Sequence, residues 1–239
     1  MIHEFSRTEM LVGPQKIQRL ADSRVAVFGV GGVGSHAAEA LARGGVGSLA
    51  LIDNDCVSLT NINRQSIALH STLGRPKVQV MQERILDINP RARVDLWQTF
   101  LLPEGVNGLF EEIGPVDYIL DAIDTVSSKL ALAEYAAAHS IPLIASMGTG
   151  NKLHPELFAI SDIRQTRVCP LCRVMRKELT ARGIQNLTVC WSPEQPLKPA
   201  PPQEDAGSRR SIPGSISFVP PAAGLLIAGK IIRDLCGLE

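Results

Sequence analysis

Residues 24–64 constrain the fold of this 239-residue chain more than any other stretch. An apolar, β-branched run breaks into the pattern Gly-x-Gly-x-x-Gly, formed by Gly29, Gly31 and Gly34, and a helical pattern follows. Gly29 permits a tight turn, Gly31 lets the backbone approach a phosphate, and Gly34 lets the helix pack close to the strand. Free N–H groups at the helix start favour an anion. The stretch therefore predicts a nucleotide-binding turn, to which we also assign Gly32.

A second apolar run, residues 49–52, ends at Asp53. This carboxylate lies about 20 residues beyond the glycines, where an acidic side chain reaches a ribose hydroxyl. The residues that follow decide between NAD and ATP. A dehydrogenase needs no guanidinium there, whereas a triphosphate site needs cations, and Arg offers paired donors to phosphate oxygens. Because Arg64 and Lys77 follow, we favour ATP, and an NAD-binding or non-catalytic Rossmann module is the alternative.

Beyond this stretch, predicted strands alternate with predicted helices. The strands are predicted at residues 94–97, 116–121, 141–145, 157–160 and 187–191, and the helices at residues 77–88, 106–113, 127–139, 170–182 and 219–235. This alternation indicates an α/β fold with a doubly wound, mainly parallel Rossmann-like sheet and helices on both faces. Ligands of such sheets bind at the carboxyl ends of the strands, where Gly31, Asp53 and Asp124 would meet.

We expect residues 1–239 to form a single domain. Residues 1–23 are predicted to form an N-terminal helical arm, with one or two short helices. The C-terminal extension includes residues 192–214, where Pro, Ser, Gln, Glu and Gly dominate. Such a composition buries too little apolar surface to order a segment, so we predict a mobile loop there.

The charge balance excludes a global electrostatic attraction to polyanions. Lys plus Arg number 24 and Asp plus Glu number 24, so nucleic acid or an anionic membrane would need a local basic patch. The most apolar late segment, residues 219–235, is interrupted by charges and is too short for the roughly 20 residues of a spanning helix. The opening residues lack the basic and apolar blocks of a signal peptide. We therefore expect a cytoplasmic protein without a membrane partner.

Motifs in a fixed order carry a family resemblance. They are Gly29-Val-Gly-Gly-Val-Gly-Ser35, Ile52-Asp-x-Asp55, Asn61-x-Asn-Arg-Gln65, Gly74-x-x-Lys77, Ile88-Asn-Pro90 and Asp121-Ala-Ile-Asp124. In this order they resemble the ubiquitin-activating-enzyme-like (ThiF-MoeB-HesA) superfamily of adenylating enzymes. The opening Phe5-Ser-Arg7, the pair Asp162-Ile163 followed by Cys169-Pro-Leu171, and the ending Ser215–Gly224 are most similar to the tRNA threonylcarbamoyladenosine dehydratases.

The resemblance implies a reaction, its cofactors and its substrate. ATP and Mg²⁺ would serve to adenylate the carboxylate of the threonylcarbamoyl group on an adenosine in tRNA. Attack from within the same modification would then close a ring with net loss of water. The alternative within the superfamily is an adenylyltransferase for the C-terminal glycine of a ubiquitin-like sulfur carrier.

The resemblance also assigns site residues. Arg64 and Lys77 would neutralise the phosphates, and Asp124 would hold Mg²⁺. Asp53, with Asn61 or Asn63, would fix the ribose and the phosphates. The other assigned cofactor-binding residues are Asp55, Gln65 and Asp121. For two of these a structural alternative is open, because Asp55 could only shape its turn and Asp121 could only cap the next helix.

Arg7 matches an N-terminal arginine that, in this superfamily, reaches the triphosphate held by the partner subunit. The match implies a homodimer with shared active sites. The alternative is an exposed charge on a short helix. A sulfur-relay protein is a further possible partner implied by the superfamily.

The cysteines leave several interpretations open. Cys169 and Cys172 have the Cys-x-x-Cys spacing of metal sites, but a tetrahedral site needs four ligands and Cys190 would supply at most a third. A zinc site, a redox pair or a catalytic thiol are therefore weighed against simple packing or surface thiols, which we favour. Cys56, near the nucleotide turn, is expected to be a packing residue.

Cations on and near the predicted helix at residues 170–182 form the only notable basic patch in the sequence. Arg173, Arg176 and Lys177 share a helical face, with Arg167 and Arg182 beside them. Together with Arg209 and Arg210, they are a candidate surface for tRNA phosphates, and a solvated helix face is the alternative. Lys129 opens the predicted helix at residues 127–139, and we expect it to lie on the surface.

Overall fold

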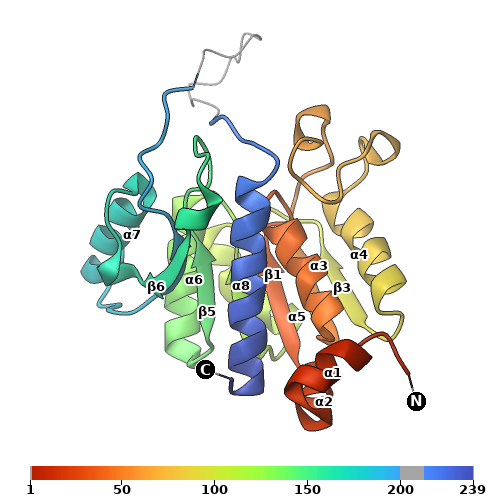
Figure 1. Ribbon diagram of the computed structural model, residues 1–239. Helices are drawn as coiled ribbons and strands as arrows, with labels where there is room; N and C mark the ends of the chain where they lie inside the picture. Colours follow the sequence, from red (N-terminus) through yellow and green to blue (C-terminus); the bar gives the residue numbers. More distant parts are fainter. Residues whose placement is uncertain (1, 200–212, 239) are drawn as a thin grey trace.

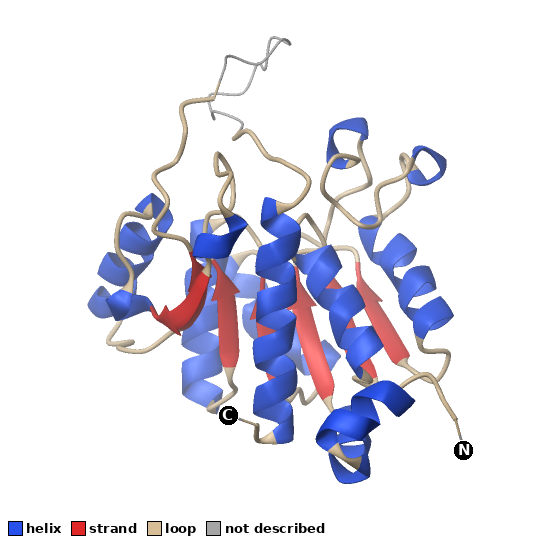
Figure 2. Ribbon diagram, viewed as in Figure 1, coloured by secondary structure: helices blue, strands red, loops and turns tan. Residues whose placement is uncertain are grey.

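The computed structural model describes residues 2–199 and 213–238 and contains a seven-stranded sheet between two layers of helices (Figures 1 and 2). The strands are β1 (Arg24–Phe28), β2 (Ser48–Ile52), β3 (Arg93–Trp97), β4 (Tyr118–Asp121), β5 (Leu143–Ser146), β6 (Ala159–Asp162) and β7 (Thr188–Trp191). Their order across the sheet is β3-β2-β1-β4-β5-β7-β6, and all neighbours are parallel except β6, which pairs antiparallel with β7. The predicted doubly wound, mainly parallel Rossmann-like sheet is confirmed.

Helices cover both faces of the sheet, as the continuous apolar runs of its strands require. The helices are α1 (Ser6–Val12), α2 (Pro14–Asp22), α3 (Gly34–Gly44), α4 (Lys77–Ile88), α5 (Val106–Ile113), α6 (Val126–His139), α7 (Pro170–Ala181) and α8 (Val219–Cys236). Val25 and Val27 of β1 pack in the core beneath α3, α4 and α8, whereas Ala26 and Phe28 pack in the core beneath α5, α6 and α7. All four side chains of this strand are therefore fully buried.

Helix α8 lies in the middle of its layer, beside α3 (Figure 1). Pro220 and Pro221 occupy its first turn, where a missing N–H costs nothing. A Cβ at Gly224 would lie 2.5 Å from the carbonyl oxygen of Val33, so glycine permits the close approach of α8 to α3. Within residues 2–199 and 213–238, every helix is too short or too polar to cross a lipid bilayer.

Helices α1 and α2 lie at the end of the sheet opposite the loops that follow β1 and β2 (Figure 1). Leu20 is buried there, and its carbonyl oxygen accepts a hydrogen bond of 2.9 Å from Gly47 N, just before β2 begins. Phe5 packs against Gly45 in the same region. The N-terminal helices are therefore anchored at the amino end of β2.

One expected segment differs from the structure, and another lies mostly outside the described residues. The strand predicted at 157–160 begins later, at Ala159, because Pro155 starts a 3₁₀ helix, η4 (Pro155–Leu157), ahead of it. The loop predicted at 192–214 lies mostly within residues 200–212, which are outside the described residues. The remaining predicted elements shift by at most a few residues at their ends.

Candidate active site

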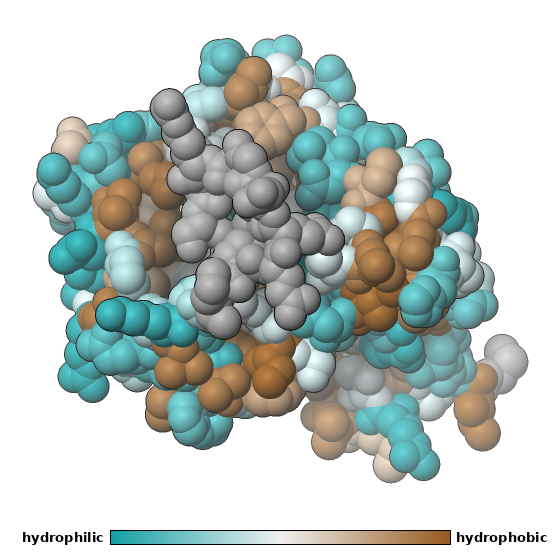
Figure 3. Space-filling view, turned by 90° about the horizontal axis from the view of Figure 1, so that it is seen from above, coloured by the Kyte–Doolittle hydropathy of each residue, from teal (hydrophilic) through white to brown (hydrophobic). Residues whose placement is uncertain are grey.

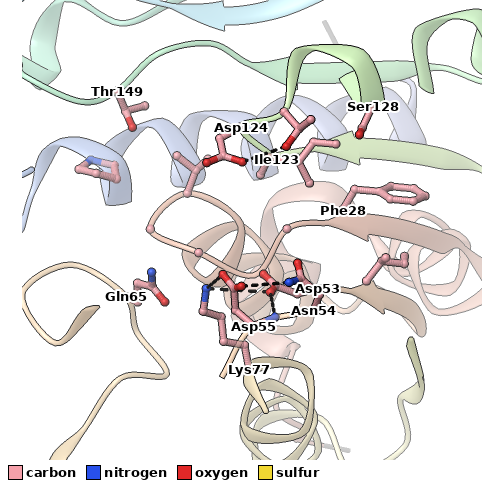
Figure 4. A pocket seen from close by; sticks show the side chains of 18 of the residues that line it. Phe28, Asp53, Asn54, Asp55, Gln65, Lys77, Ile123, Asp124, Ser128 and Thr149 are labelled. Atoms are coloured by element: carbon pink, nitrogen blue, oxygen red, sulfur yellow. Dashed lines mark hydrogen bonds and ion pairs between the residues drawn. The ribbon is translucent and has the colours of Figure 1, made fainter. Parts of the chain in front are cut away.

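A pocket of about 350 Å³ opens at the carboxyl ends of the strands. It lies at β1, where the strand order reverses: β2 and β3 follow on one side of β1, and β4 and β5 follow on the other. Ligands of doubly wound sheets usually bind at such a switch point. Its lining comes from the glycine turn after β1, the ends of β2 and β4, the loops after β3 and β5, the segment from residue 64 to the start of α4, and the segment that leads into α8. Figure 4 shows Lys77, Asp53 and Asp55 together on one wall and Asp124 across from them.

The glycine turn has no room for a side chain at Gly29 or at Gly34. Gly29 has a φ of +89°, and a Cβ there would lie 2.8 Å from the carbonyl oxygen of Ala122. A Cβ at Gly34 would lie 1.8 Å from the carbonyl oxygen of Gly29, so α3 can begin against the turn only with glycine at this position. Gly31 and Gly32 line the pocket, whereas Gly34 does not. The turn therefore brings bare backbone to the floor of the pocket.

Asp53 stabilises the turn as well as lining the pocket. Its carboxylate accepts hydrogen bonds from Val30 N at 2.7 Å and from Asp55 N at 2.8 Å. Burial raises the pKa of Asp53, and the nearby ammonium of Lys77 opposes that rise. Lys77 Nζ lies 3.9 Å from Asp53 Oδ1 and 2.7 Å from Asp55 Oδ2. Lys77 is thus nearly buried, paired with carboxylates and at the pocket wall, where a phosphate could compete for its ammonium.

Arg64 and Gln65 face the pocket from the segment between β2 and α4. Arg64 Nη1 donates to the carbonyl oxygen of Thr60 at 2.8 Å and to Asn63 Oδ1 at 2.9 Å, and burial lowers the pKa of its guanidinium. Gln65 is buried, and its Oε1 has no hydrogen-bond partner among the described residues. A buried acceptor without a partner is costly, so this oxygen fits a donor on a bound ligand, such as a ribose hydroxyl.

The two aspartates that follow β4 have opposite environments. Asp124 is exposed and lines the pocket, and its carboxylate is an oxygen donor of the kind that Mg²⁺ prefers. Asp121 is fully buried behind the pocket wall and does not line it. Its Oδ2 lies 2.9 Å from Lys129 Nζ, and burial raises its pKa against the effect of that ammonium. The expectation of a surface position for Lys129 is therefore wrong, because its charge is neutralised inside the protein.

Three other predicted site residues lie outside the pocket lining. Asn61 is buried and shapes its own 3₁₀ turn, where its Oδ1 accepts from Ser58 N at 3.1 Å. Asn63 Nδ2 donates to the carbonyl oxygen of Ser215 at 2.9 Å and so holds the segment that precedes α8. Arg7 is exposed on α1, at the end of the molecule opposite the pocket.

Sequence reasoning missed several lining residues. They include Phe28, Asn54, Ile123, Ser128, Thr149, Gly150 and Ser215. Thr149 and Gly150 follow β5, so the rule that ligands bind at the carboxyl ends of strands could have identified them. Ser215 is different, because only the folded chain brings the segment before α8 over the glycine turn.

The cysteines are mostly buried. Cys169 and Cys172 lie at the start of α7, and the Cys172 thiol donates a hydrogen bond to Cys169. This hydrogen bond lowers the pKa of Cys169 to about 5 and raises the pKa of Cys172. Cys190 lies elsewhere in the core, and burial raises its pKa to about 12. Among the described residues, no three metal-ligating side chains come together. Cys56 is exposed, so the expectation that it packs in the interior is wrong.

The basic patch predicted around α7 is smaller than the sequence suggests. Arg176 folds back, and its Nη1 donates to the carbonyl oxygen of Thr166 at 2.9 Å. Arg182 forms ion pairs with Glu134 and Glu178. The exposed cations that remain are Arg167, Arg173 and Lys177. Arg209 and Arg210 lie outside the described residues.

Comparison with known proteins finds similar chains along the whole length. The model of the ThiF family matches residues 5–239. The tRNA threonylcarbamoyladenosine dehydratase of Bacillus subtilis is 42% identical over 244 residues, which cover 98% of this chain and 95% of that relative. The Escherichia coli protein of the same name is 42% identical over 175 residues, 73% of this chain and 65% of the relative. A crystal structure of the E. coli dehydratase in complex with ATP, 33% identical, matches with a TM-score of 0.86 and covers 98% of this chain and 94% of that chain.

Proposed function

We propose a function from the premise that this chain belongs to the ThiF family: it catalyses the ATP-dependent dehydration of threonylcarbamoyladenosine in tRNA. The observation that carries the proposal is the lining of one pocket by a glycine turn, Arg64, Lys77 and Asp124. An NAD-binding module would need the turn and Asp53 but no guanidinium and ammonium beside them. Two cations on the pocket wall suit a triphosphate.

The chemistry explains why ATP is consumed. A carboxylate does not react with a weak nucleophile until one of its oxygens becomes part of a good leaving group. Attack of the threonylcarbamoyl carboxylate on the α-phosphate of ATP releases pyrophosphate and forms an acyl adenylate. A nucleophile within the same modification then attacks the acyl carbon, closes a ring and releases AMP, so the nucleoside loses one water overall.

Each wall of the pocket has a part in this reaction. The backbone at Gly31 and Gly32 would contact the phosphates closely, because no side chain intervenes. Arg64 and Lys77 would neutralise charge on the phosphates, where fixed cations stabilise a transition state without reorganisation. Gln65, whose Oε1 has no partner within the part of the chain that the structure describes, would accept a hydrogen bond from the nucleotide. With the nucleotide held in this way, the reaction requires the carboxylate to approach the α-phosphate in line.

Magnesium fits the same site. Asp124 offers an exposed carboxylate at the pocket wall, and Mg²⁺ is commonly held by one or two carboxylates together with substrate phosphates. When bound, the ion would neutralise phosphate charge. Asp53 and Asp55 are already engaged with Lys77 and the turn, which leaves Asp124 as the principal protein ligand.

We place the reaction in the cytoplasm, where tRNA is modified, in a homodimer that shares its active sites. Helix α1 lies at the end of its own subunit opposite the carboxyl ends of the strands (Figure 1), so in the proposed dimer Arg7 would contact the triphosphate of the partner subunit.

Figure 3 shows the end of the molecule at which the pocket opens, where hydrophobic patches interrupt a hydrophilic surface. Exposed apolar side chains between β2 and α4 offer a surface for a protein contact, and they are Leu59, Leu69 and Leu73. A sulfur-relay protein is a second partner that would need such a surface.

The proposal is tested with ATP, Mg²⁺ and tRNA that carries threonylcarbamoyladenosine. We expect the gently released nucleoside to lose the mass of one water. Arg64→Ala and Asp124→Ala should each lower the rate about 100-fold or more, as loss of a preorganised charge at a transition state does. Arg43→Ala, which removes an exposed cation paired with Glu39 on α3, is the matched control and should leave the rate unchanged.

One outcome would separate the substrate from the chemistry. If the nucleoside mass does not change while the C-terminal glycine of a sulfur-carrier protein becomes adenylated, the chain is an adenylyltransferase for that carrier. The family assignment would then hold, and the tRNA substrate would be wrong.

A further inference from the structure

Two lysine–aspartate pairs flank the glycine turn, and they differ in their access to the pocket. Lys77 pairs with Asp55 at the end of β2 and lines the pocket. Lys129 pairs with Asp121 at the end of β4, with exposed side-chain fractions of 0% and 1%. A lysine this deeply buried cannot reach a nucleotide. Lys129 and Asp121, the buried pair, can therefore influence the pocket only through the backbone that they contact.

The buried pair binds both the N–H and the carbonyl oxygen of one residue, Ile123, in the loop between β4 and α6. Lys129 Nζ donates to the carbonyl oxygen of Ile123 at 3.2 Å. Asp121 Oδ1 accepts from the N–H of Ile123 at 3.2 Å. The two charges therefore fix the peptide groups on either side of Ile123, and Asp124 is the next residue.

The same loop is also held against the glycine turn. Ala122 N donates to the carbonyl oxygen of Phe28 at 2.8 Å, and the carbonyl oxygen of Ala122 lies where a Cβ at Gly29 would clash. Lys129 N donates to the carbonyl oxygen of Thr125 at 3.0 Å, which closes the first turn of α6. The loop thus has fixed contacts on both sides of Asp124.

Asp124 itself has little to orient it. The only hydrogen bond recorded for its carboxylate among the described residues is a long one, 3.4 Å, from Thr125 Oγ1. Its carboxylate lies across the pocket from Lys77 and Asp55 (Figure 4). The direction of this side chain therefore depends on the backbone at residues 122–125, and the buried pair supplies the side-chain contacts to that backbone at Ile123.

We infer that Lys129 is a positioning residue, which acts through Asp121 and Ile123 to hold the Asp124 carboxylate in the geometry that binds metal-complexed ATP. The inference rests on the proposed function for the role of Asp124. Without the ammonium, the Asp121 carboxylate would be buried without a counter-charge and would protonate or move. Either change would release Ile123 and let Asp124 leave its position.

The test measures the affinity for ATP by calorimetry, once with Mg²⁺ and once with EDTA. The ratio of the two affinities is the factor by which Mg²⁺ tightens binding. We expect both Lys129→Met and Asp124→Asn to reduce this factor at least tenfold, while the affinity in EDTA changes little. Lys230→Met is the matched control, because Lys230 forms an ion pair with Asp234 on α8, outside the pocket lining. In this variant Mg²⁺ should tighten ATP binding by the same factor as in the wild type. A wild-type factor in Lys129→Met would overturn the inference.

A second variant guards against a loss of folding. Asp121→Asn with Lys129→Met removes both charges, which is tolerated better than the loss of one partner. If this double variant melts like the wild type but lacks the Mg²⁺ effect, the pair positions Asp124. If it binds metal-complexed ATP as the wild type does, or if neither variant unfolds cooperatively on heating, the pair serves folding alone and the inference fails. A wild-type protein indifferent to Mg²⁺ would instead contradict the proposed metal role of Asp124, and the inference would fall with it.

Discussion

At the residue scale, the site depends on positions where one extra carbon atom or one lost charge has a large effect. Gly34 is the tightest of the glycines in the turn, because its hypothetical Cβ would lie 1.8 Å from a backbone oxygen, whereas the corresponding distance at Gly29 is 2.8 Å. The sequence predicted close packing of helix and strand at this position, and the structure shows which atom enforces it. Backbone in a packed sheet cannot give way as a side-chain end can.

We predict that Gly34→Ala destabilises the fold and weakens ATP binding. The Cβ would lie 1.8 Å from the carbonyl oxygen of Gly29, so the turn must shift, at a cost of about 1–3 kcal/mol in the free energy of unfolding. Urea denaturation and ATP titration would measure the two effects. Gly108→Ala in α5 is the control, because no atom lies within 4 Å of a Cβ there, and it should stabilise the helix slightly. Equal stability of the two variants would contradict the packing argument.

At the element scale, helix α7 carries the exposed cations that are available for a polyanion. Its buried face includes Cys172, Met175 and Leu179, which pack beneath the sheet. Its exposed face keeps Arg173 and Lys177 one helical turn apart, whereas Arg176 is turned inward by its contact with Thr166. The amphipathic pattern of α7 could predict which helix face is exposed. It could not predict the hydrogen bond of Arg176, because that bond joins α7 to Thr166 in the segment before the helix.

We predict that Arg173→Glu with Lys177→Glu weakens tRNA binding at least tenfold and lowers its salt dependence. Each lost phosphate contact reduces the number of counterions that are released on binding. Filter binding over a series of salt concentrations would measure both effects. Arg233→Glu reverses an exposed charge on α8 and should leave the affinity unchanged. Unaltered tRNA affinity in the α7 variant would show that this helix face is only solvated.

At the scale of the whole molecule, the position of Arg7 distinguishes a shared site from a self-contained one. In a single subunit, α1 lies at the end of the sheet opposite the carboxyl ends of the strands (Figure 1), and the residues that line the pocket lie at those carboxyl ends. If Arg7 contacts a triphosphate, it must therefore contact the one held by a partner subunit. Complementation between two inactive variants reports such sharing directly.

We predict that Arg7→Ala and Arg64→Ala, each inactive as a homodimer, recover activity when they are unfolded and refolded together. Half of the dimers in an equal mixture are heterodimers, and one of their two sites has both arginines. The expected recovery is about a quarter of the wild-type rate. Arg64→Ala mixed with Asp124→Ala should show no recovery, because both residues line the same pocket of one subunit. Absence of recovery in the first mixture would contradict a role for Arg7 across the dimer.

The sequence alone predicted the sheet and the nucleotide turn, because apolar runs, glycine spacing and strand ends depend on neighbours along the chain. The family resemblance pointed to Arg64, Lys77 and Asp124, and the structure places these three residues in the lining of one pocket. The burial of Lys129 and the contact of Asn63 with Ser215 did not follow from such patterns. Both depend on residues that are distant in sequence or on neighbours that meet only when the strands pack, so only the tertiary structure revealed these contacts of Lys129 and Asn63.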